Sequence, residues 1–363
     1  MEIFMDYQKT IQQVLDNAVE RGIECGCQAA LFIDGELAAN AYSGWTDWNK
    51  TKKVDENTVF PIYSCGKAMS STVIHRLVEM GKVDYDTRIA DFWPEFGCNG
   101  KEDMRVWHVL SYRSALWSIP DVSDAGDQPE DADKVLADFT EMTRRIAKAN
   151  LDEPFGGKQK YHAQTYGWLT GGIACHLLNT DDYPAIFREL VGNPVGMDRF
   201  FYGIDANEDN AVTLVKGLDG NCQSEAGVVR MNKPIYRQCC NPSTCAMSSA
   251  LSLAKHYAAL DSGKLLSQET IDNAINLKWR AKEDTIECIR GRWELFGLGY
   301  VMSGPVGDLT RIFGHGGLGG SEALLDQKKH FAFTYTRNCF ANPNAIFDIY
   351  DAIDFKNRDW PEA

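Results

Sequence analysis

No stretch of this sequence approaches the roughly 20 consecutive apolar residues that a membrane-spanning helix needs. Its first residues lack the basic segment and the apolar core of a secretory signal. Basic residues are few: 37 Lys and Arg stand against 51 Asp and Glu, and the formal net charge is -14. Because nucleic acid and anionic membrane surfaces bind through clustered cationic side chains, this composition argues against both as partners. We therefore expect a cytoplasmic protein with neither partner.

Metal-binding cysteine motifs are also missing. The chain has 11 cysteines, but none of them forms a C-x-x-C pair with another. Four cysteines that come close together in the sequence have no histidine pair beside them; they are Cys222, Cys239, Cys240 and Cys245. We therefore predict no metal and no cofactor. An odd cysteine count in a chain of this length favours free thiols in a reducing compartment.

The order of the predicted elements indicates the fold. Apolar residues at helical spacing predict a helix over 6–21, and Asp34-Gly35 between extended runs at 28–33 and 36–42 predicts a hairpin. The segment 203–245 has no helical period, so we expect it to be irregular. Helices are predicted at 248–260, 268–277 and 343–354, and further strands at 295–302, 309–313, 322–325 and 331–335.

Strands at both ends of the chain, with helices between them, predict a mixed α/β (α+β) protein. We expect an antiparallel sheet built from both chain ends and flanked by helices, with an inserted, mostly helical domain. The sheet domain would comprise 1–83 plus 246–363. The inserted domain, with a loop or lid region, would comprise 84–245, and the two would form one catalytic unit. The oligomeric state is open at this point.

The segment Ser64-Cys65-Gly66-Lys67 begins the most regular predicted helix, which ends near Gly81. A lysine three positions after a serine lies on the same helical face, where its amine can take the proton that makes a serine hydroxyl a poor nucleophile. The helix start offers unpaired N–H groups to a developing oxyanion. On these residues alone, a serine cap followed by a solvated lysine is the simpler interpretation.

Two further segments supply possible partners. Tyr161, just before a helix predicted at 171–178, can serve as a general base if its phenol faces a cleft, although a packed aromatic side chain is the plainer interpretation. Residues 314–320 contain five glycines in seven positions, which indicates a close approach of the backbone to another group. The segment does not match a phosphate-binding P-loop, and a bulged edge strand is the alternative.

Together and in this order, S-x-x-K, the tyrosine motif and His315-Gly316-Gly317 resemble the serine β-lactamase-related superfamily. That superfamily contains class C β-lactamases, D-alanyl-D-alanine carboxypeptidases and family VIII carboxylesterases. The resemblance covers roughly 10 to 345 and implies a β-lactamase/transpeptidase-like fold. It implies that Ser64 is the acylated nucleophile and that Lys67 and Tyr161 share its proton, with the division between them open.

The resemblance also implies the rest of the site. The backbone N–H groups of Ser64 and Leu318 would form the oxyanion hole. His315, where many relatives have a lysine, would bind a substrate carboxylate or polarise Tyr161. The implied substrate-binding residues are Tyr112, His162, Gly316 and Gly317.

Three departures from the family pattern bear on the substrate. The usual Tyr-x-Asn motif ends here in Ala163, so the asparagine amide that would hold an acylamino side chain is missing. His315 replaces lysine, and residues 110–115 read Leu-Ser-Tyr-Arg-Ser-Ala instead of Leu-Thr-His-Thr-Ser-Gly. We therefore expect a serine hydrolase that acts through an acyl-enzyme on a small ester, as a carboxylesterase or acyltransferase. The alternatives are a β-lactam- or D-amino-acid-directed peptidase or amidase, and a catalytically idle homologue that only binds a ligand.

Overall fold

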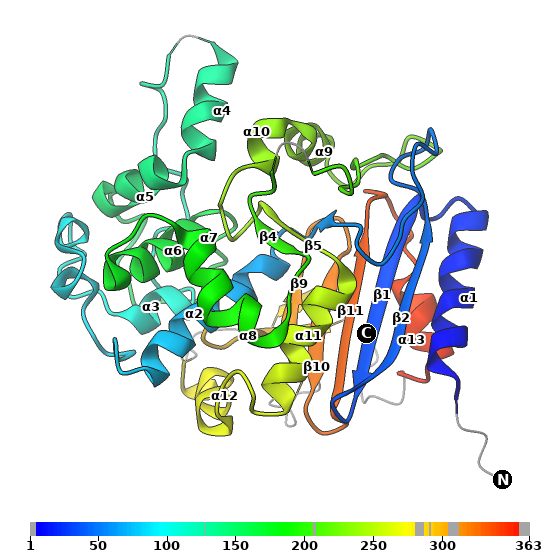
Figure 1. Ribbon diagram of the computed structural model, residues 1–363. Coiled ribbons are helices and arrows are strands. Elements are labelled where there is room, and N and C mark those ends of the chain that lie inside the picture. The colour runs from blue at the N-terminus through cyan, green and yellow to red at the C-terminus, as the bar shows by residue number, and fades with distance from the viewer. Residues whose placement is uncertain are drawn as a thin grey trace.

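One antiparallel sheet joins the two ends of the chain (Figure 1). The computed structural model describes residues 5–126, 128–205, 208–279, 287–289, 292–303 and 312–355. Eight strands lie in the order β2-β1-β11-β10-β9-β8-β7-β6. Their bounds are β1 Gly26–Ile33, β2 Glu36–Gly44, β6 Glu287–Ile289, β7 Arg292–Phe296, β8 Val301–Ser303, β9 Ile312–Gly316, β10 Glu322–Asp326 and β11 Phe331–Arg337. The predicted antiparallel sheet from both chain ends is confirmed.

The hairpin predicted at Asp34-Gly35 joins β1 to β2. Both turn residues have positive φ, 51° and 80°, as a two-residue hairpin turn requires. β1 also pairs with β11, so a strand from the start of the chain lies between its neighbour in sequence and a strand from the end of the chain.

The single strand predicted over 295–302 is wrong, because the chain turns back on itself there. β7 ends at Phe296 and β8 begins at Val301, and the two strands pair with each other. Gly299 has φ +86°, a conformation that apolar strand residues do not adopt, and it allows the turn. Of the strand predicted at 309–313, residues 309–311 lie outside the described residues; Ile312 and Phe313 begin β9.

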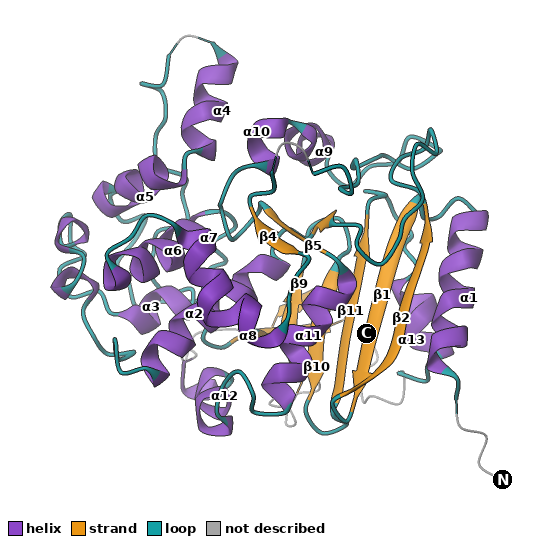
Figure 2. Cartoon of the chain, in the orientation of Figure 1, coloured by secondary structure: helices purple, strands orange, loops and turns teal. Residues whose placement is uncertain are grey.

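Helices cover both faces of the sheet (Figure 2). α1 and α13 pack on one face and α11 on the other, which confirms three predicted helices. β1 shows why both faces are covered: Ala29 and Leu31 belong to the cluster with α1, whereas Ala30 contacts α11. The helix bounds are α1 Tyr7–Glu20, α11 Ala250–Asp261, α12 Gln268–Ala274 and α13 Ile346–Ala352.

Most of the helices between residues 65 and 237 lie beside the sheet (Figures 1 and 2). The α-helices of this range are α2 Cys65–Glu79, α3 Val106–Leu110, α4 Pro129–Ala137, α5 Phe139–Lys148, α6 Thr165–Leu178, α7 Tyr183–Phe187, α8 Asn193–Val195, α9 Glu225–Asn232 and α10 Pro234–Arg237. A small second sheet consists of β3 Phe60–Pro61, β5 Ala246–Ser248 and β4 Phe200–Tyr202, in that order, and β3 precedes α2 in the chain. The prediction that 203–245 is irregular is wrong in part, because α9 and α10 lie within it.

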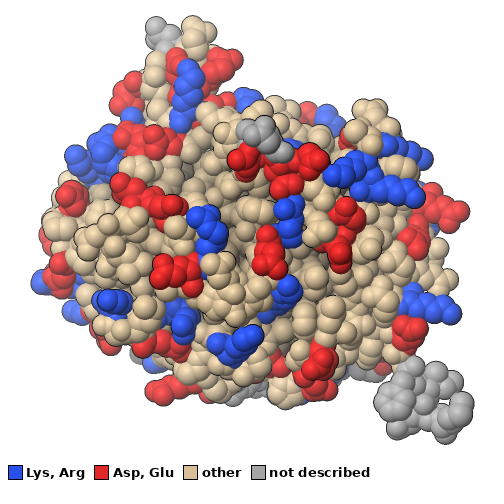
Figure 3. Space-filling view, viewed as in Figure 1, with Lys and Arg blue, Asp and Glu red and all other residues tan. Residues whose placement is uncertain are grey.

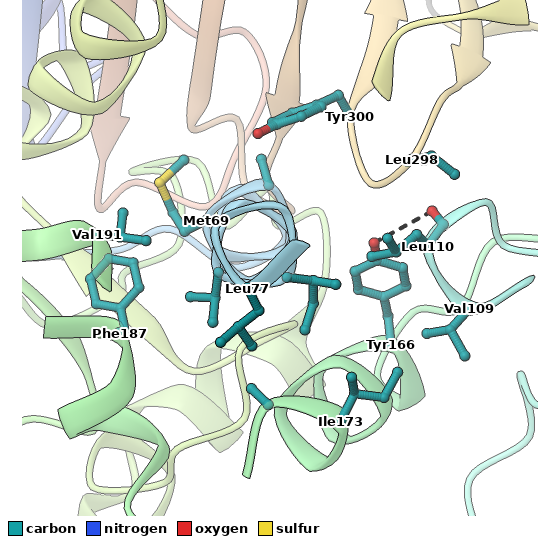
Figure 4. Packing of buried hydrophobic residues seen from close by; sticks show 14 of the residues in the cluster. Met69, Leu77, Val109, Leu110, Tyr166, Ile173, Phe187, Val191, Leu298 and Tyr300 are labelled. Carbon is teal, nitrogen blue, oxygen red and sulfur yellow. Dashed lines mark hydrogen bonds between the residues drawn. The ribbon is translucent and has the colours of Figure 1, made fainter. Parts of the chain in front are cut away.

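α2 runs through the largest hydrophobic cluster (Figure 4). Met69 and Leu77 of this helix are fully buried, and side chains from α6, from 109–110 and from the turn before β8 surround it. The helix is therefore enclosed on nearly all sides, which fixes the position of its first turn.

A buried ion pair ties the two chain ends together. Arg337 Nε donates to Glu24 Oε2 at 2.7 Å, and both side chains are almost completely buried. Tyr335 Oη donates to Glu24 Oε1 at 2.7 Å. Arg337 Nη1 also donates to the carbonyls of Gly319, at 3.1 Å, and Ala341, at 2.7 Å. The pair therefore holds the glycine-rich turn after β9 against the sheet.

Replacing Arg337 by methionine is expected to lower the free energy of unfolding by about 3–5 kcal/mol, because it leaves the Glu24 carboxylate buried without its cation. Urea denaturation at neutral pH measures this loss. The double variant Glu24→Gln/Arg337→Met should be more stable than Arg337→Met, since it removes the uncompensated charge. A single variant as stable as the parent protein would contradict the prediction.

Candidate active site

The serine of the S-x-x-K segment lies at the start of α2. The chain enters from β3 through Tyr63, which has φ +46°, a left-handed conformation that is uncommon for a non-glycine residue. Ser64 then has helical angles and caps α2, but its side chain makes no capping hydrogen bond. The hydroxyl is therefore available for other contacts.

Lys67 contacts this hydroxyl from within the protein interior. Its Nζ lies 2.9 Å from Ser64 Oγ, 2.8 Å from the Ala163 carbonyl and 3.2 Å from the Ser243 carbonyl. Burial lowers the pKa of Lys67 well below its usual range, so the neutral amine is favoured. A neutral amine has two N–H donors and one lone pair. With the donors on the two carbonyls, the lone pair faces the Ser64 hydroxyl.

Tyr161 contacts the same hydroxyl from the solvent side. Its Oη lies 2.7 Å from Ser64 Oγ, and its side chain is 37% exposed. The Tyr161 ring stacks on the rings of Tyr112 and Phe296, with centroids 5.5 and 5.9 Å apart. Lys67 Nζ lies 4.8 Å from the ring centroid of Tyr161. Ser64 Oγ thus has two proton-exchanging groups within hydrogen-bond distance.

His315 lies nearby on β9, with its ring centroid 6.1 Å from that of Tyr161. Burial lowers the pKa of His315 to about 3, so the imidazole is neutral. Its Nδ1 lies 2.7 Å from the Gly316 carbonyl, which can only accept, so Nδ1 carries the proton. The buried Nε2 therefore presents a lone pair, and it has no partner among the described residues.

The turn after β9 comes very close to the start of α2. A Cβ added to Gly317 would lie 2.2 Å from the Ile62 carbonyl oxygen, so only glycine fits there. Cys65 Sγ donates to the His315 carbonyl at 3.1 Å. Within the described part of the chain, the N–H groups of Ser64 and Leu318 have no hydrogen-bond acceptor. These two donors are available to an oxyanion on the substrate.

A cavity of about 370 Å³ lies in front of Ser64, a size typical of small-molecule sites. Its lining is mostly apolar and comes from several elements. The lining residues are Tyr63, Ser64, Leu136, Tyr161, Ala163, Gln164, Ser224, Ala226, Gly227, Arg230, Met231, Tyr236, Cys239, Asn241, Thr244, Cys245 and Leu318.

None of the four residues predicted to bind substrate lines the cavity, and two of them, Tyr112 and His162, are buried. Tyr112 is fully buried behind Tyr161 and stacks on Tyr166 at 4.6 Å. His162 is also buried: its Nδ1 donates to the Lys160 carbonyl at 2.5 Å, and its Nε2 lies 2.7 Å from Ser114 Oγ. Both side chains support the segment that carries Tyr161.

The glycines predicted to bind substrate lie closer to the nucleophile. Gly316 is exposed and Gly317 partly exposed, both on the turn beside α2. Sequence reasoning missed Gln164 and Arg230, which do line the cavity. Gln164 could have been predicted, because it directly follows the tyrosine motif. Arg230 could not, because the helix that carries it was not predicted.

Within the described ranges, no three His, Cys, Asp or Glu side chains come together as metal ligands would. No helix of the described chain is long and apolar enough to span a membrane.

Comparison with known proteins places the chain in a family. The family model described as Beta-lactamase matches residues 11–354. The esterase/β-lactamase LipL of Mycobacterium tuberculosis is 27% identical over 355 residues, which cover 89% of this chain and 79% of LipL. Esterase EstB of Burkholderia gladioli is 25% identical, over 52% of this chain and 49% of EstB.

Solved structures share the fold. A family VIII carboxylesterase superposes with a TM-score of 0.80 at 22% identity, over 97% of this chain and 98% of that one. A penicillin-binding protein homologue from Caulobacter crescentus superposes with a TM-score of 0.79 at 24% identity, over 97% of each chain.

Proposed function

Because the chain belongs to the Beta-lactamase family, we propose that it is a serine hydrolase that cleaves or transfers the acyl group of a small ester. One observation carries the proposal: Lys67 Nζ and Tyr161 Oη both lie within hydrogen-bond distance of Ser64 Oγ. A serine hydroxyl needs such a partner to become a nucleophile, and this one has two.

In the proposed reaction, Ser64 Oγ attacks the ester carbonyl while its proton passes to the Lys67–Tyr161 pair. The N–H groups of Ser64 and Leu318 donate to the carbonyl oxygen and stabilise the negative charge that develops on it. The pair returns the proton to the leaving alcohol, and an acyl-enzyme remains on Ser64. Water or another acceptor then attacks the acyl-enzyme through the same proton transfers and releases the acyl group from Ser64.

The neutral imidazole of His315 bears on the choice of substrate. The sequence predicts that His315 binds a substrate carboxylate or polarises Tyr161. A lone pair on Nε2 repels a carboxylate and accepts from a hydroxyl instead. The first of these roles is therefore not proposed. The second role, polarisation of Tyr161, agrees with this tautomer, because Nε2 can accept from a hydroxyl.

A second candidate is hydrolysis of an amide, as in a β-lactam or a D-amino-acid amide. Ala163 places a methyl group where relatives have an asparagine. However, the side-chain amide of Gln164 also lines the cavity and has no partner among the described residues. That amide can replace the missing one, and this observation keeps the candidate open.

Fluorophosphonate labelling tests the nucleophile without knowledge of the substrate. We expect one adduct by intact mass, mapped to Ser64, which is lost in Ser64→Ala and kept in Ser70→Ala, a buried serine one turn beyond Lys67. The protein that is labelled at Ser64 should also hydrolyse para-nitrophenyl butyrate. Nitrocefin turnover without ester turnover would favour the second candidate, and no labelling at all would favour a protein that only binds a ligand.

A further inference from the structure

The cavity in front of Ser64 has one charged residue in its lining. Of the described lining residues, Arg230 alone carries a charge. The outer surface is different: on the face shown in Figure 3, acidic and basic side chains lie interspersed. A lone cation in a mostly apolar cavity, in a chain with net charge -14, calls for an anionic ligand.

Arg230 lies in the last turn of α9, with its guanidinium carbon 5.2 Å from the ring centroid of Tyr236. Tyr236 lines the same cavity, so this contact places the exposed side chain of Arg230 at the rim of the cavity. No carboxylate of the described residues forms an ion pair with Arg230. The nearby carboxylate of Asp133 is already bonded to Lys233 and, at 2.7 Å, to Tyr236 Oη.

The charge of Arg230 acts on other groups around the cavity. Burial raises the pKa of Tyr63, and the positive charge of Arg230 partly opposes that rise. Tyr63 directly precedes the nucleophile and lines the cavity. An anion bound beside Arg230 would therefore share the cavity with Ser64.

We infer that the substrate of the proposed serine hydrolase is an ester with a carboxylate at its far end, which Arg230 binds across the cavity from Ser64. The inference rests on the proposed function and adds a substrate class to it. An Arg guanidinium matches a carboxylate with paired N–H donors. The apolar lining, which includes Leu136 and Met231, suits a hydrocarbon chain between the carboxylate and the scissile bond.

A matched pair of esters tests this inference. Mono-para-nitrophenyl adipate carries the carboxylate on its acyl half, and its methyl ester is the neutral counterpart. The pair para-(butyryloxy)benzoate and methyl para-(butyryloxy)benzoate places the carboxylate on the alcohol half. In one of the two pairs we expect a higher kcat/KM for the anionic ester, and Arg230→Gln should lower that value about tenfold through KM. Arg230→Lys should retain part of the preference.

Arg144→Gln is the matched control, because it removes the same charge from α5, where Arg144 is bonded to Glu141. It should leave kcat/KM for both members of each pair unchanged. Equal kcat/KM for anionic and neutral esters in both pairs, or a preference that survives in Arg230→Gln, would overturn the inference. Hydrolysis of the neutral esters would show in that case that the proposed function still stands.

Binding to Ser64→Ala gives a measurement that does not depend on turnover. We expect calorimetry to show tighter binding of the anionic member of one pair, and loss of that difference in Ser64→Ala/Arg230→Gln. Equal binding of anionic and neutral members would refute the anion site even if no ester is hydrolysed. Absence of all hydrolysis would count against the proposed function alone.

Discussion

Lys67→Met is expected to lower kcat for para-nitrophenyl butyrate by about 10³-fold, because methionine cannot take the proton of Ser64. Lys67 Nζ lies 2.9 Å from Ser64 Oγ, and burial lowers its pKa, which favours the free amine that can act as a base. The rate of the parent enzyme should rise with pH through this lowered pKa. Stopped-flow measurement of the acylation rate against pH should show that this rise is absent in the variant.

Lys101→Met provides the control for this experiment. Lys101 is as fully buried as Lys67, and its Nζ donates to the Ala149 carbonyl at 2.6 Å, outside the lining of the cavity. Its replacement should affect stability but leave kcat and the pH profile unchanged. A Lys67→Met variant that keeps the parent kcat, or a Lys101→Met variant that loses it equally, would contradict the role of Lys67 as the base.

Tyr161→Phe is expected to lower kcat by about 10²-fold, with a smaller change in KM. The variant keeps the ring that stacks on Phe296 but loses the hydroxyl 2.7 Å from Ser64 Oγ. That hydroxyl would return the proton to the leaving alcohol, so the loss should be largest for esters of poorly acidic alcohols. Comparison of para-nitrophenyl and ethyl esters measures this dependence.

Tyr112→Phe is the matched control on the same aromatic stack. The Tyr112 hydroxyl is buried and has no partner among the described residues, so its removal should leave kcat unchanged and not destabilise the protein. If instead Tyr112→Phe raises KM while Tyr161→Phe leaves kcat intact, then the two tyrosines have been assigned the wrong roles.

Local sequence patterns predicted the centre of the site because its geometry is local. Ser64 and Lys67 lie on one helical face whenever their segment is helical, whatever the rest of the fold. The glycines of 314–320 likewise indicate a close approach of the backbone, whatever the turn packs against. The sheet could be predicted for the same reason. Its hairpin depends on Asp34 and Gly35 alone, and its later strands are short apolar runs between turns.

The rest of the site depends on contacts between distant segments. Nothing local distinguishes the buried Tyr112 and His162 from the exposed Tyr161, since burial depends on what packs against each ring. α9 was not predicted because its apolar residues Val228 and Val229 are adjacent and form no stripe. Arg230 could be placed at the cavity only once that helix was known.

The joining of both chain ends in one sheet has a consequence for synthesis on the ribosome. The Gly26 amide donates to Asn338 Oδ1, and the two residues are 312 positions apart in the sequence. β1 therefore leaves the ribosome long before its partner β11 is synthesised, and the edge of β1 that pairs with β11 stays unpaired until then. Arg337, which holds the turn beside Ser64, arrives equally late. A nascent chain should thus gain activity only when its last strand has emerged.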